Sequence, residues 1–349
     1  MISFKTMIAT IILLGPTLCA AQAIHVDGIV QDTAGVGISG VTVKLEMANI
    51  STTTGADGQF TFADATITKP ATQPGTTGLS AALGTTSTPA RQTLPSAGFA
   101  DTIAVTKEGQ LHYRDLIRTY DARGMVIRMI PNAGNVTDVD GNVYQSVRIG
   151  NQVWTVENLR TTKFNDGTPI PEVTEIAEWA KTAQPARCWY NNDAASNHEK
   201  YGVLYNWLAV NTGNLAPKGW HVPTDADWSA LETYLIENGY NFDGSTTGNK
   251  IAKAVAAKTD WRSCTASGAV GNDLSKNNAS GFSALPGGYR SCSKGEGVFS
   301  TRGEMGFWWS STVYEGKLAY NRSLYYGNDH LFRHVHLPQN GFSVRLVRD

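Results

Sequence analysis

Hydrophobic and polar residues alternate with a period of two through the first part of the chain. The stretch from Ile24, IHVDGIVQDTAGVGISGVTVKLEM, alternates valine and isoleucine with polar residues and is interrupted by glycines, which is typical of short half-buried strands. Asp57-Gly58 stands between two β-prone runs in TTTGADGQFTFAD and predicts a hairpin. Closing strands are expected in DTIAVTKEGQLHYRDLIRTY and GMVIRMIP. The pattern predicts an all-β sandwich over residues 24–132.

The segment from Thr66 to Gly98 interrupts this pattern. It is rich in Thr, Pro, Ala and Gly and contains no aromatic residue, so it cannot bury enough apolar surface to offset the entropy cost of ordering. We expect a flexible insertion at about residues 66–98. A second breaker, PNAGN at residues 131–135, predicts a domain boundary.

A second domain is expected at residues 136–349, and it opens with the same period of two. In VTDVDGNVYQSVRIGNQVWTVENL, Asp140-Gly141 and Gly150-Asn151 each stand between alternating runs. Both pairs predict hairpin turns.

Asp138, Asp140 and Asn142 also match the first ligand positions of a calcium loop. Ile149 stands where such a loop needs a bidentate glutamate. We therefore interpret the segment as a turn.

The pattern changes to helical spacing in GWHVPTDADWSALETYL at residues 219–235. Thr224 is a good N-cap, and Asp227 three residues later completes a capping box. We interpret His221 as a packed or hydrogen-bonded residue rather than a catalytic one. The apolar residues at helical spacing are Trp228, Leu231 and Leu235. The pattern predicts a helix with one apolar stripe packed on a sheet.

Composition supports two domains with different cores. The chain has 349 residues, and its nine tryptophans all lie after residue 150. The formal net charge of −1 gives no field that would attract nucleic acid or anionic lipid, so these partners are not expected.

The first 23 residues have the pattern of a secretory signal peptide. Lys5 precedes the apolar run MIATIILLG, and AQA at residues 21–23 offers small residues for cleavage. Cys19 suggests a lipid anchor as an alternative, but Leu18 stands where that site needs a small residue. No later segment approaches the roughly 20 apolar residues of a membrane helix. We expect a soluble protein that is secreted or at the cell surface, periplasmic or extracellular.

Cleavage after residue 23 leaves three cysteines in a compartment that permits disulfides. Cys264 and Cys292 stand in Ser/Gly-rich loop sequence, and Cys188 has a more apolar context. We predict a Cys264–Cys292 disulfide and a buried Cys188 thiol. A metal site made from these scattered cysteines is disfavoured.

The first domain resembles the carboxypeptidase regulatory-like (transthyretin-like) domains of secreted bacterial proteins. The resemblance rests on three motifs in order, at Gly28 to Asp32, Gly40 to Leu45 and Thr54 to Phe60. It implies a β-sandwich.

The second domain resembles the Fibrobacter succinogenes major paralogous domain family. The motifs, in order, are VTDVDGNVYQSVRIGNQVWTVENL, CWYNND, YGVLYNW, GWHVPTDADW, SGFSALPGGYR, GFWWSST and NGFSVRLVRD. A more distant resemblance is to the formylglycine-generating enzymes. Both resemblances imply an α+β, C-type-lectin-like fold with antiparallel strands and two helices.

The enzyme resemblance implies copper-dependent oxidation by a late cysteine pair, but no cysteine follows Cys292. The sequence also has no hydrolase, zinc-protease or phosphate-loop motif. It lacks the Glu-Pro-Asn, Gln-Pro-Asp and Trp-Asn-Asp motifs of calcium-dependent sugar-binding lectins. We expect no catalytic residues, no cofactor and no dedicated metal.

A binding surface is predicted within GFWWSSTVYEGKLAYNRSLYYGNDHLFRHVHL at residues 306–337. Aromatic rings stack on sugar faces or peptide side chains, and Asn, Asp and Arg bond to hydroxyls. The alternative is that half of the rings, Trp308, Tyr320 and Phe332, alternate into a core. His334 and His336, with His330 nearby, could hold zinc or copper, but no dedicated site is expected. The predicted ligand-binding residues are Trp309, Tyr314, Asn321, Arg322, Tyr325, Tyr326, Asn328 and Asp329.

These observations favour a secreted, non-enzymatic surface or adhesion protein that recognises an extracellular polysaccharide or a surface protein. A structural cell-envelope component without a ligand is the first alternative, and an oxidase related to formylglycine generation is the second.

Overall fold

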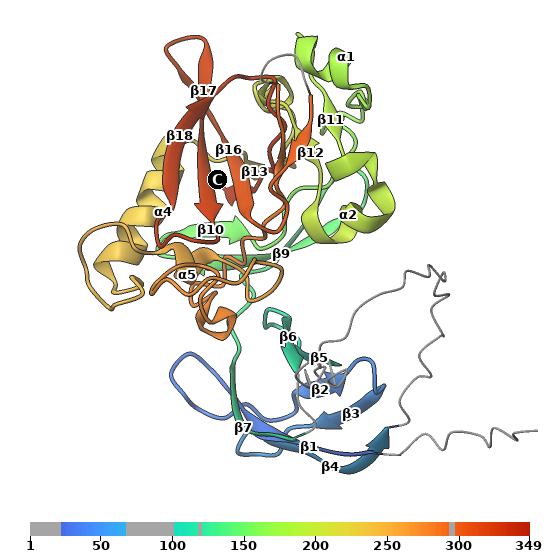
Figure 1. Cartoon of the computed structure of the whole chain (residues 1–349), viewed down its shortest axis with the longest axis vertical. Helices are drawn as coiled ribbons and strands as arrows, with labels where there is room; N and C mark the ends of the chain where they lie inside the picture. Colours follow the sequence, from blue (N-terminus) through green and yellow to red (C-terminus); the bar gives the residue numbers. More distant parts are fainter. Residues whose placement is uncertain (1–21, 68–100, 118–120, 293–296) are drawn as a thin grey trace, which may run out of the picture.

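The computed structural model describes residues 22–67, 101–117, 121–292 and 297–349. It is mostly β structure, arranged in several sheets with few helices (Figure 1). Residues 1–21 of the predicted signal peptide and residues 68–98 of the predicted insertion lie outside the described residues.

The N-terminal part contains two sheets that share one core. In the first, β1 (Gln22–Gln31) pairs antiparallel with β4 (Gln59–Ile67) and parallel with β7 (Asp121–Arg128). The second has the order β3-β2-β5-β6, with β2 at Thr42–Leu45, β3 at Ile50–Thr53, β5 at Asp101–Thr106 and β6 at Tyr113–Ile117. The core draws residues from both sheets: Ile24, Val26, Val30, Val41, Val43, Leu45, Phe60, Phe62, Ile103, Val105, Ile127 and Met129.

The hairpin predicted at Asp57-Gly58 is wrong, although the turn is present. β3 and β4, on either side of the turn, belong to different sheets. Gly58 has φ +81, and a Cβ there would lie 2.4 Å from the Val30 carbonyl oxygen, so glycine is needed for this close approach. The turn therefore carries the chain from one sheet to the other.

The C-terminal part is built around a five-stranded and a three-stranded sheet. The first has the order β13-β19-β10-β9-β8, and the second the order β16-β17-β18. Their strands are β8 (Asn135–Thr137), β9 (Val143–Ile149), β10 (Gln152–Thr155), β13 (Trp220–His221), β16 (Met305–Tyr314), β17 (Leu318–Tyr325), β18 (Phe332–His336) and β19 (Val347–Arg348). Two short pairs complete it: β11 (Arg187–Cys188) with β12 (Leu204–Tyr205), and β14 (Tyr289–Arg290) with β15 (Phe299–Ser300).

The described residues contain five α-helices in the C-terminal part, where two were expected. Only α4 exceeds eight residues. The helices are α1 (Ile176–Lys181), α2 (Ala194–Tyr201), α3 (Trp207–Val210), α4 (Asp225–Glu237) and α5 (Ala252–Val255), and the short 3-10 helices are η1 (Tyr190–Asn192) and η2 (Leu274–Lys276).

The two hairpins predicted at the start of the C-terminal part are confirmed. β8 pairs with β9 across Asp140-Gly141, and β9 pairs with β10 across Gly150-Asn151. Asp138 accepts hydrogen bonds from the Asp140 and Asn142 amides at 2.9 and 3.0 Å. The carboxylate therefore organises the turn, as the sequence indicated.

The predicted helix and cap are confirmed in α4. The Thr224 side chain accepts from the Asp227 amide, and the Asp227 carboxylate accepts from the Thr224 amide. His221 lies within hydrogen-bonding distance of Asp227 and Asp349, at 3.1 and 2.7 Å, as interpreted from the sequence. The buried stripe is Trp228, Leu231 and Leu235.

The connection between the two parts is docked onto the C-terminal core. Leu111, in the loop between β5 and β6, is 6% exposed and belongs to that core, and Ile130 packs against the same core. The Ala133 amide donates to the Ser146 carbonyl at 2.8 Å, and Ser146 Oγ donates to the Gly134 carbonyl at 2.6 Å. The segment that the sequence indicated as a breaker is therefore held against β9.

Residues 342–348 run through the middle of the C-terminal part. β19 lies between β10 and β13. Arg345 is fully buried, and its guanidinium donates to the carbonyls of Thr155 at 2.8 Å and Phe282 at 2.9 Å. This segment joins loops and strands that are far apart in the sequence.

Candidate binding surface

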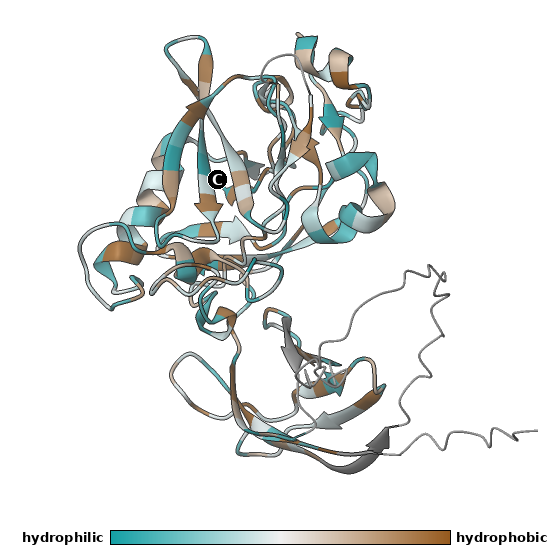
Figure 2. Ribbon diagram, in the orientation of Figure 1, coloured by the Kyte–Doolittle hydropathy of each residue, from teal (hydrophilic) through white to brown (hydrophobic). Residues whose placement is uncertain are grey.

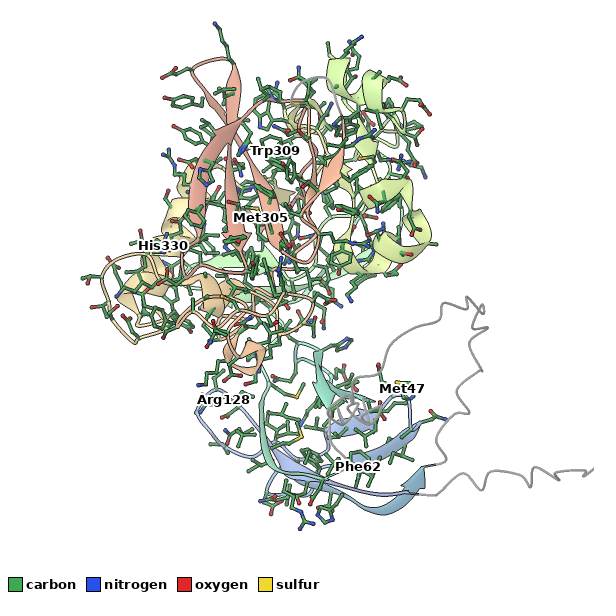
Figure 3. The ribbon with its side chains drawn as sticks, in the orientation of Figure 1. Met47, Phe62, Arg128, Met305, Trp309 and His330 are labelled. Carbon is green, nitrogen blue, oxygen red and sulfur yellow. The ribbon has the colours of Figure 1, made fainter. Side chains whose placement is uncertain are left out.

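Three of the eight residues predicted to contact a ligand lie in the interior. Trp309, Asn321 and Arg322 are each 0% exposed, and Figure 3 shows Trp309 among other side chains of the C-terminal part. Because a ligand cannot reach them, the prediction is wrong for these three. The other five are partly exposed: Tyr314, Tyr325, Tyr326, Asn328 and Asp329.

These side chains are buried because both faces of the three-stranded sheet are covered where they lie. Trp308 belongs to the core beneath α4, as the alternative interpretation expected, and Trp309 belongs to a second core on the other face. Figure 2 shows both hydrophobic and hydrophilic positions along the strands of this sheet. Period-two alternation therefore does not separate core from surface here.

The buried Arg322 side chain forms ion pairs with two acidic residues of α4. Its Nη1 lies 2.7 Å from Asp225 Oδ1, and its Nε bonds to the Glu232 carboxylate. Asn321 Oδ1 lies 2.8 Å from His336 Nδ1. Both side chains join β17 to neighbouring elements.

Asn328 and Asp329 mainly shape a turn. Asn328 Oδ1 accepts from the amides of Asp329 and His330, at 2.8 and 3.1 Å. Tyr314 lies at the opposite end of β17 from Tyr325, with its ring centre 5.3 Å from that of Tyr320. The predicted residues therefore do not form one continuous patch. Tyr320 and Phe332, which the alternative interpretation placed in the core, are partly exposed.

Tyr325 and Tyr326 lie beside an open pocket at one end of the three-stranded sheet. Their ring centres are 4.6 Å apart. The pocket has a volume of about 510 Å³ and is lined by Asp260, Trp261, Arg262, Leu274, Arg302, Gly303 and Glu304. This part of the predicted surface therefore adjoins a concavity.

Arginines stack on tyrosines along both sides of the pocket. The Arg262 guanidinium carbon lies 5.1 Å from the centre of the Tyr326 ring. Arg302 lies 4.8 Å from the Tyr190 ring centre and 5.9 Å from that of Tyr201. We call the set Tyr190, Tyr201, Arg262, Arg302, Tyr325 and Tyr326 the Tyr–Arg surface.

Backbone hydrogen bonds hold the two sides of the pocket together. The Arg262 amide donates to the Gly303 carbonyl at 2.7 Å, and the Tyr326 amide donates to the Glu304 carbonyl at 2.9 Å. Loop 259–262, turn 301–304 and the end of β17 therefore form one unit.

Two residues at this pocket have a left-handed backbone without being glycine. Asp260 has φ 72 and Thr301 has φ 62, a conformation that is costly for a β-branched residue such as threonine. Thr301 Oγ1 is buried and has no hydrogen-bond partner among the described residues. Strained backbone conformations persist only where the surrounding structure enforces them, and they are found most often at functional sites.

Charges around the pocket are paired but accessible. Lys200 Nζ lies 2.6 Å from Asp260 Oδ1, and Arg262 Nη1 lies 2.6 Å from Glu304 Oε1. Burial, together with the nearby Asp260 carboxylate, raises the pKa of Tyr201 to about 12. Tyr201 is therefore a neutral hydroxyl group at physiological pH.

Sequence reasoning missed Tyr190, Tyr201, Arg262 and Arg302 as members of this surface. They come from η1, the end of α2, loop 259–262 and the turn before β16. No local pattern links them, because they meet only through tertiary packing.

The histidines do not assemble a metal site. His334 and His336 have ring centres 6.1 Å apart. Within the described ranges, no three His, Cys, Asp or Glu side chains are grouped so that they could hold a metal ion.

The predicted Cys264–Cys292 disulfide is wrong. Cys188, Cys264 and Cys292 are all free thiols. The Cys264 amide bonds to the Gly271 carbonyl, whereas the Cys292 amide bonds to Asn340 Oδ1, so the two thiols belong to different regions. Cys188 is buried, as predicted.

Over the described residues, none of the helices combines the length and the apolarity needed to cross a membrane. A comparison with curated proteins gives no match. The family model of the Fibrobacter succinogenes major domain matches residues 147–348, a range that contains most residues of the two large C-terminal cores and the whole Tyr–Arg surface. The chain belongs to the Fibrobacter succinogenes major domain family.

Proposed function

We propose that this chain is a secreted, non-enzymatic surface or adhesion protein that binds polysaccharide through the Tyr–Arg surface. In this proposal residues 136–349 have a C-type-lectin-like fold and form the recognition module. The N-terminal part, carboxypeptidase regulatory-like in fold, serves as a spacer.

The observation that carries the proposal is the stacking of Arg262 and Arg302 on tyrosine rings beside an open pocket. Tyrosine rings stack on the C–H faces of sugars, and guanidinium groups donate directional hydrogen bonds to hydroxyls. Each arginine held over a ring loses less side-chain entropy when a ligand arrives. The surface is therefore organised before binding.

The pairing of the charges suits a ligand without net charge. Asp260 and Glu304, the acids of the pocket lining, each have a cationic partner at 2.6 Å. The pocket therefore offers hydrogen-bonding groups to sugar hydroxyls without a strong field of one sign.

The test is a binding screen of the purified full chain on cellulose, xylan, bacterial cell-wall preparations and a glycan array, with and without EDTA. Saturable binding that resists EDTA is expected. Tyr325→Ala/Tyr326→Ala and Arg302→Ala should each weaken it about tenfold or more.

Tyr314→Ala is the matched control, because Tyr314 is a partly exposed ring at the other end of the same sheet. It should bind as the wild type does. Equal losses in the control and the Tyr325/Tyr326 variant would place the contact elsewhere. Binding to no polysaccharide would overturn the sugar ligand and leave a protein partner or a structural role in the envelope.

A further inference from the structure

A second concavity lies between the N-terminal and C-terminal parts and shares no lining residue with the pocket beside the Tyr–Arg surface. It is a cleft of about 580 Å³. Its N-terminal wall includes Leu111, His112, Val126 and Arg128, and its C-terminal wall includes residues 275–279. Clefts of this size between domains are common ligand sites.

The cleft has a fixed floor because the connection between the two parts is docked. Ile130 lines the cleft and packs against the C-terminal core, and Leu111 is buried in that core. Gly281, also in the lining, approaches Ile130 so closely that a Cβ there would lie 3.0 Å from Ile130 Cδ1. The walls are therefore joined by packed side chains as well as by the chain itself.

The charged lining of the cleft has one sign. Arg128, Lys258 and Lys276 contribute cations, His112 adds an ionisable ring, and no Asp or Glu belongs to the lining. Arg128, labelled in Figure 3 near the point where the chain passes to the C-terminal part, is exposed. The Lys276 side chain is 75% exposed, and its Nζ lies 3.4 Å from Asp273 Oδ2. A cleft with cations from both walls attracts an anion more strongly than either wall alone.

The uncharged residues of the lining offer two further kinds of contact to a ligand. Thr33, Ser275, Asn278 and Ser283 provide hydroxyl and amide groups that bond to ligand hydroxyls. Val126, which is 57% exposed, and Tyr240 provide apolar surface. An anion that carries hydroxyls and apolar C–H faces satisfies all three kinds of group.

We propose that this cleft binds an acidic oligosaccharide, with its carboxylates directed at Arg128 and Lys276. The site is separate from the Tyr–Arg surface and does not depend on the function proposed for it. It would let the N-terminal part take a direct share in binding.

The experiment is calorimetric titration of the full chain with a short oligogalacturonate and with its methyl-esterified, neutral form. The acidic form should bind, more weakly as salt is raised, because screening weakens exposed charge pairs. The esterified form should bind at least about tenfold more weakly.

Arg128→Glu and Lys276→Glu should each weaken binding of the acidic form about tenfold or more. Lys317→Glu is the control, because it makes the same change in net charge at the exposed turn between β16 and β17. The thermal midpoint of each variant checks folding. Tyr325→Ala/Tyr326→Ala should keep this binding, which separates the two sites.

Three results would overturn the proposal. One is the absence of oligogalacturonate binding at low salt, and another is equal binding of the acidic and esterified forms. The third is a loss of oligogalacturonate affinity in Lys317→Glu as large as that in Arg128→Glu. It would mean that the net charge of the protein, rather than the cleft, determines binding.

Discussion

Trp308 and Trp309 are neighbours in the chain, but their indole rings enter different cores. Trp308 Nε1 donates to Asn158 Oδ1 at 2.9 Å, and Trp309 Nε1 donates to the Tyr205 carbonyl at 2.8 Å. Both rings are almost fully buried. β16 therefore holds the two larger cores of the C-terminal part together.

Trp309→Ala should lower the free energy of unfolding by about 3–5 kcal/mol, because it leaves a large cavity and removes one of the two hydrogen bonds that the Tyr205 carbonyl accepts. Denaturant unfolding followed by circular dichroism measures the change. A loss below about 1 kcal/mol would contradict the buried position. Trp309→Phe should be less harmful, since it keeps most of the ring volume.

Arg322 and Arg333 provide a matched comparison, because both bond to Asp225. Arg322 is 0% exposed and Arg333 is 48% exposed. Arg322→Ala should cost about 3–5 kcal/mol, since it removes a fully buried side chain and leaves the largely buried Glu232 carboxylate without its hydrogen-bonded cation, whereas Asp225 keeps Arg333. Arg333→Ala should cost about 1 kcal/mol or less. Similar losses in denaturant unfolding of the two variants would contradict the difference in burial.

Acid should destabilise the protein partly through His336. Burial, together with the neighbouring His334, lowers the pKa of His336 from 6.5 to about 4. Between these values the unfolded chain binds more protons than the folded one, so stability falls as pH drops from about 6.5 to 4. His336→Gln should flatten this part of a stability–pH curve from urea unfolding. An unchanged slope would contradict the assignment, and His330→Gln reports the effect of replacing an exposed histidine.

Carboxylates such as Asp225 act in a different pH range. Burial opposes the ionised form, but hydrogen bonds from Arg333 and Arg322 outweigh it and lower the pKa of Asp225 below 3.8. Its contribution to stability is therefore present above about pH 4 and is lost as pH falls further. Burial raises the pKa of Glu157 and of Glu232 above 4.5, so these two carboxyl groups also contribute to the slope between about pH 6.5 and 4. The difference between the wild type and His336→Gln therefore reports on the histidine.

The thiols should differ in reactivity. Burial raises the pKa of Cys188 to about 12 and also raises the pKa of Cys292, and the thiolate is the reactive form. Cys264, which is partly exposed, should react with iodoacetamide at pH 8 about tenfold or more faster than the other two. Peptide mapping by mass spectrometry measures each site. Detection of a disulfide-linked pair of peptides containing Cys264 and Cys292 would contradict the free thiols and support the disulfide predicted from the sequence.

Thr301→Gly should raise the free energy of unfolding by about 1 kcal/mol. Glycine adopts the left-handed backbone freely, and the change also removes a buried hydroxyl without a partner. Thermal unfolding of both proteins measures the difference. Thr265→Gly is the control: Thr265 is exposed and is not among the residues with positive φ, so this change should not stabilise. A lower midpoint for Thr301→Gly would show that the turn is not strained.

Local signals in the sequence were sufficient for elements whose determinants are local. The cap of α4 depends on Thr224 and Asp227, three residues apart, and the hairpins of β9 depend on adjacent turn residues. Gly58 shows the limit of such signals. It predicts a turn correctly, but strand pairing depends on which sheet each strand joins, and alternation carries no such information.

The binding surface was predictable only in part for the same reason. Asn321 and Arg322 are polar residues on β17 and would be expected at the surface, but both are buried. Nothing in the local sequence shows that other elements cover both faces of this strand. Tyr325 and Tyr326 were found because they are clustered in sequence. Arg302 and Tyr190 are more than a hundred positions apart, and they meet only after the chain has folded.

The position of residues 342–348 also constrains the order of folding. The hydrogen-bond partners of this segment, from Ala133 to Trp309, are synthesised before it. While the chain emerges, β10 and β13 have no strand between them, and the carbonyls that Arg345 will bind have no donor. The sheet of the C-terminal part is therefore completed only when this late segment arrives.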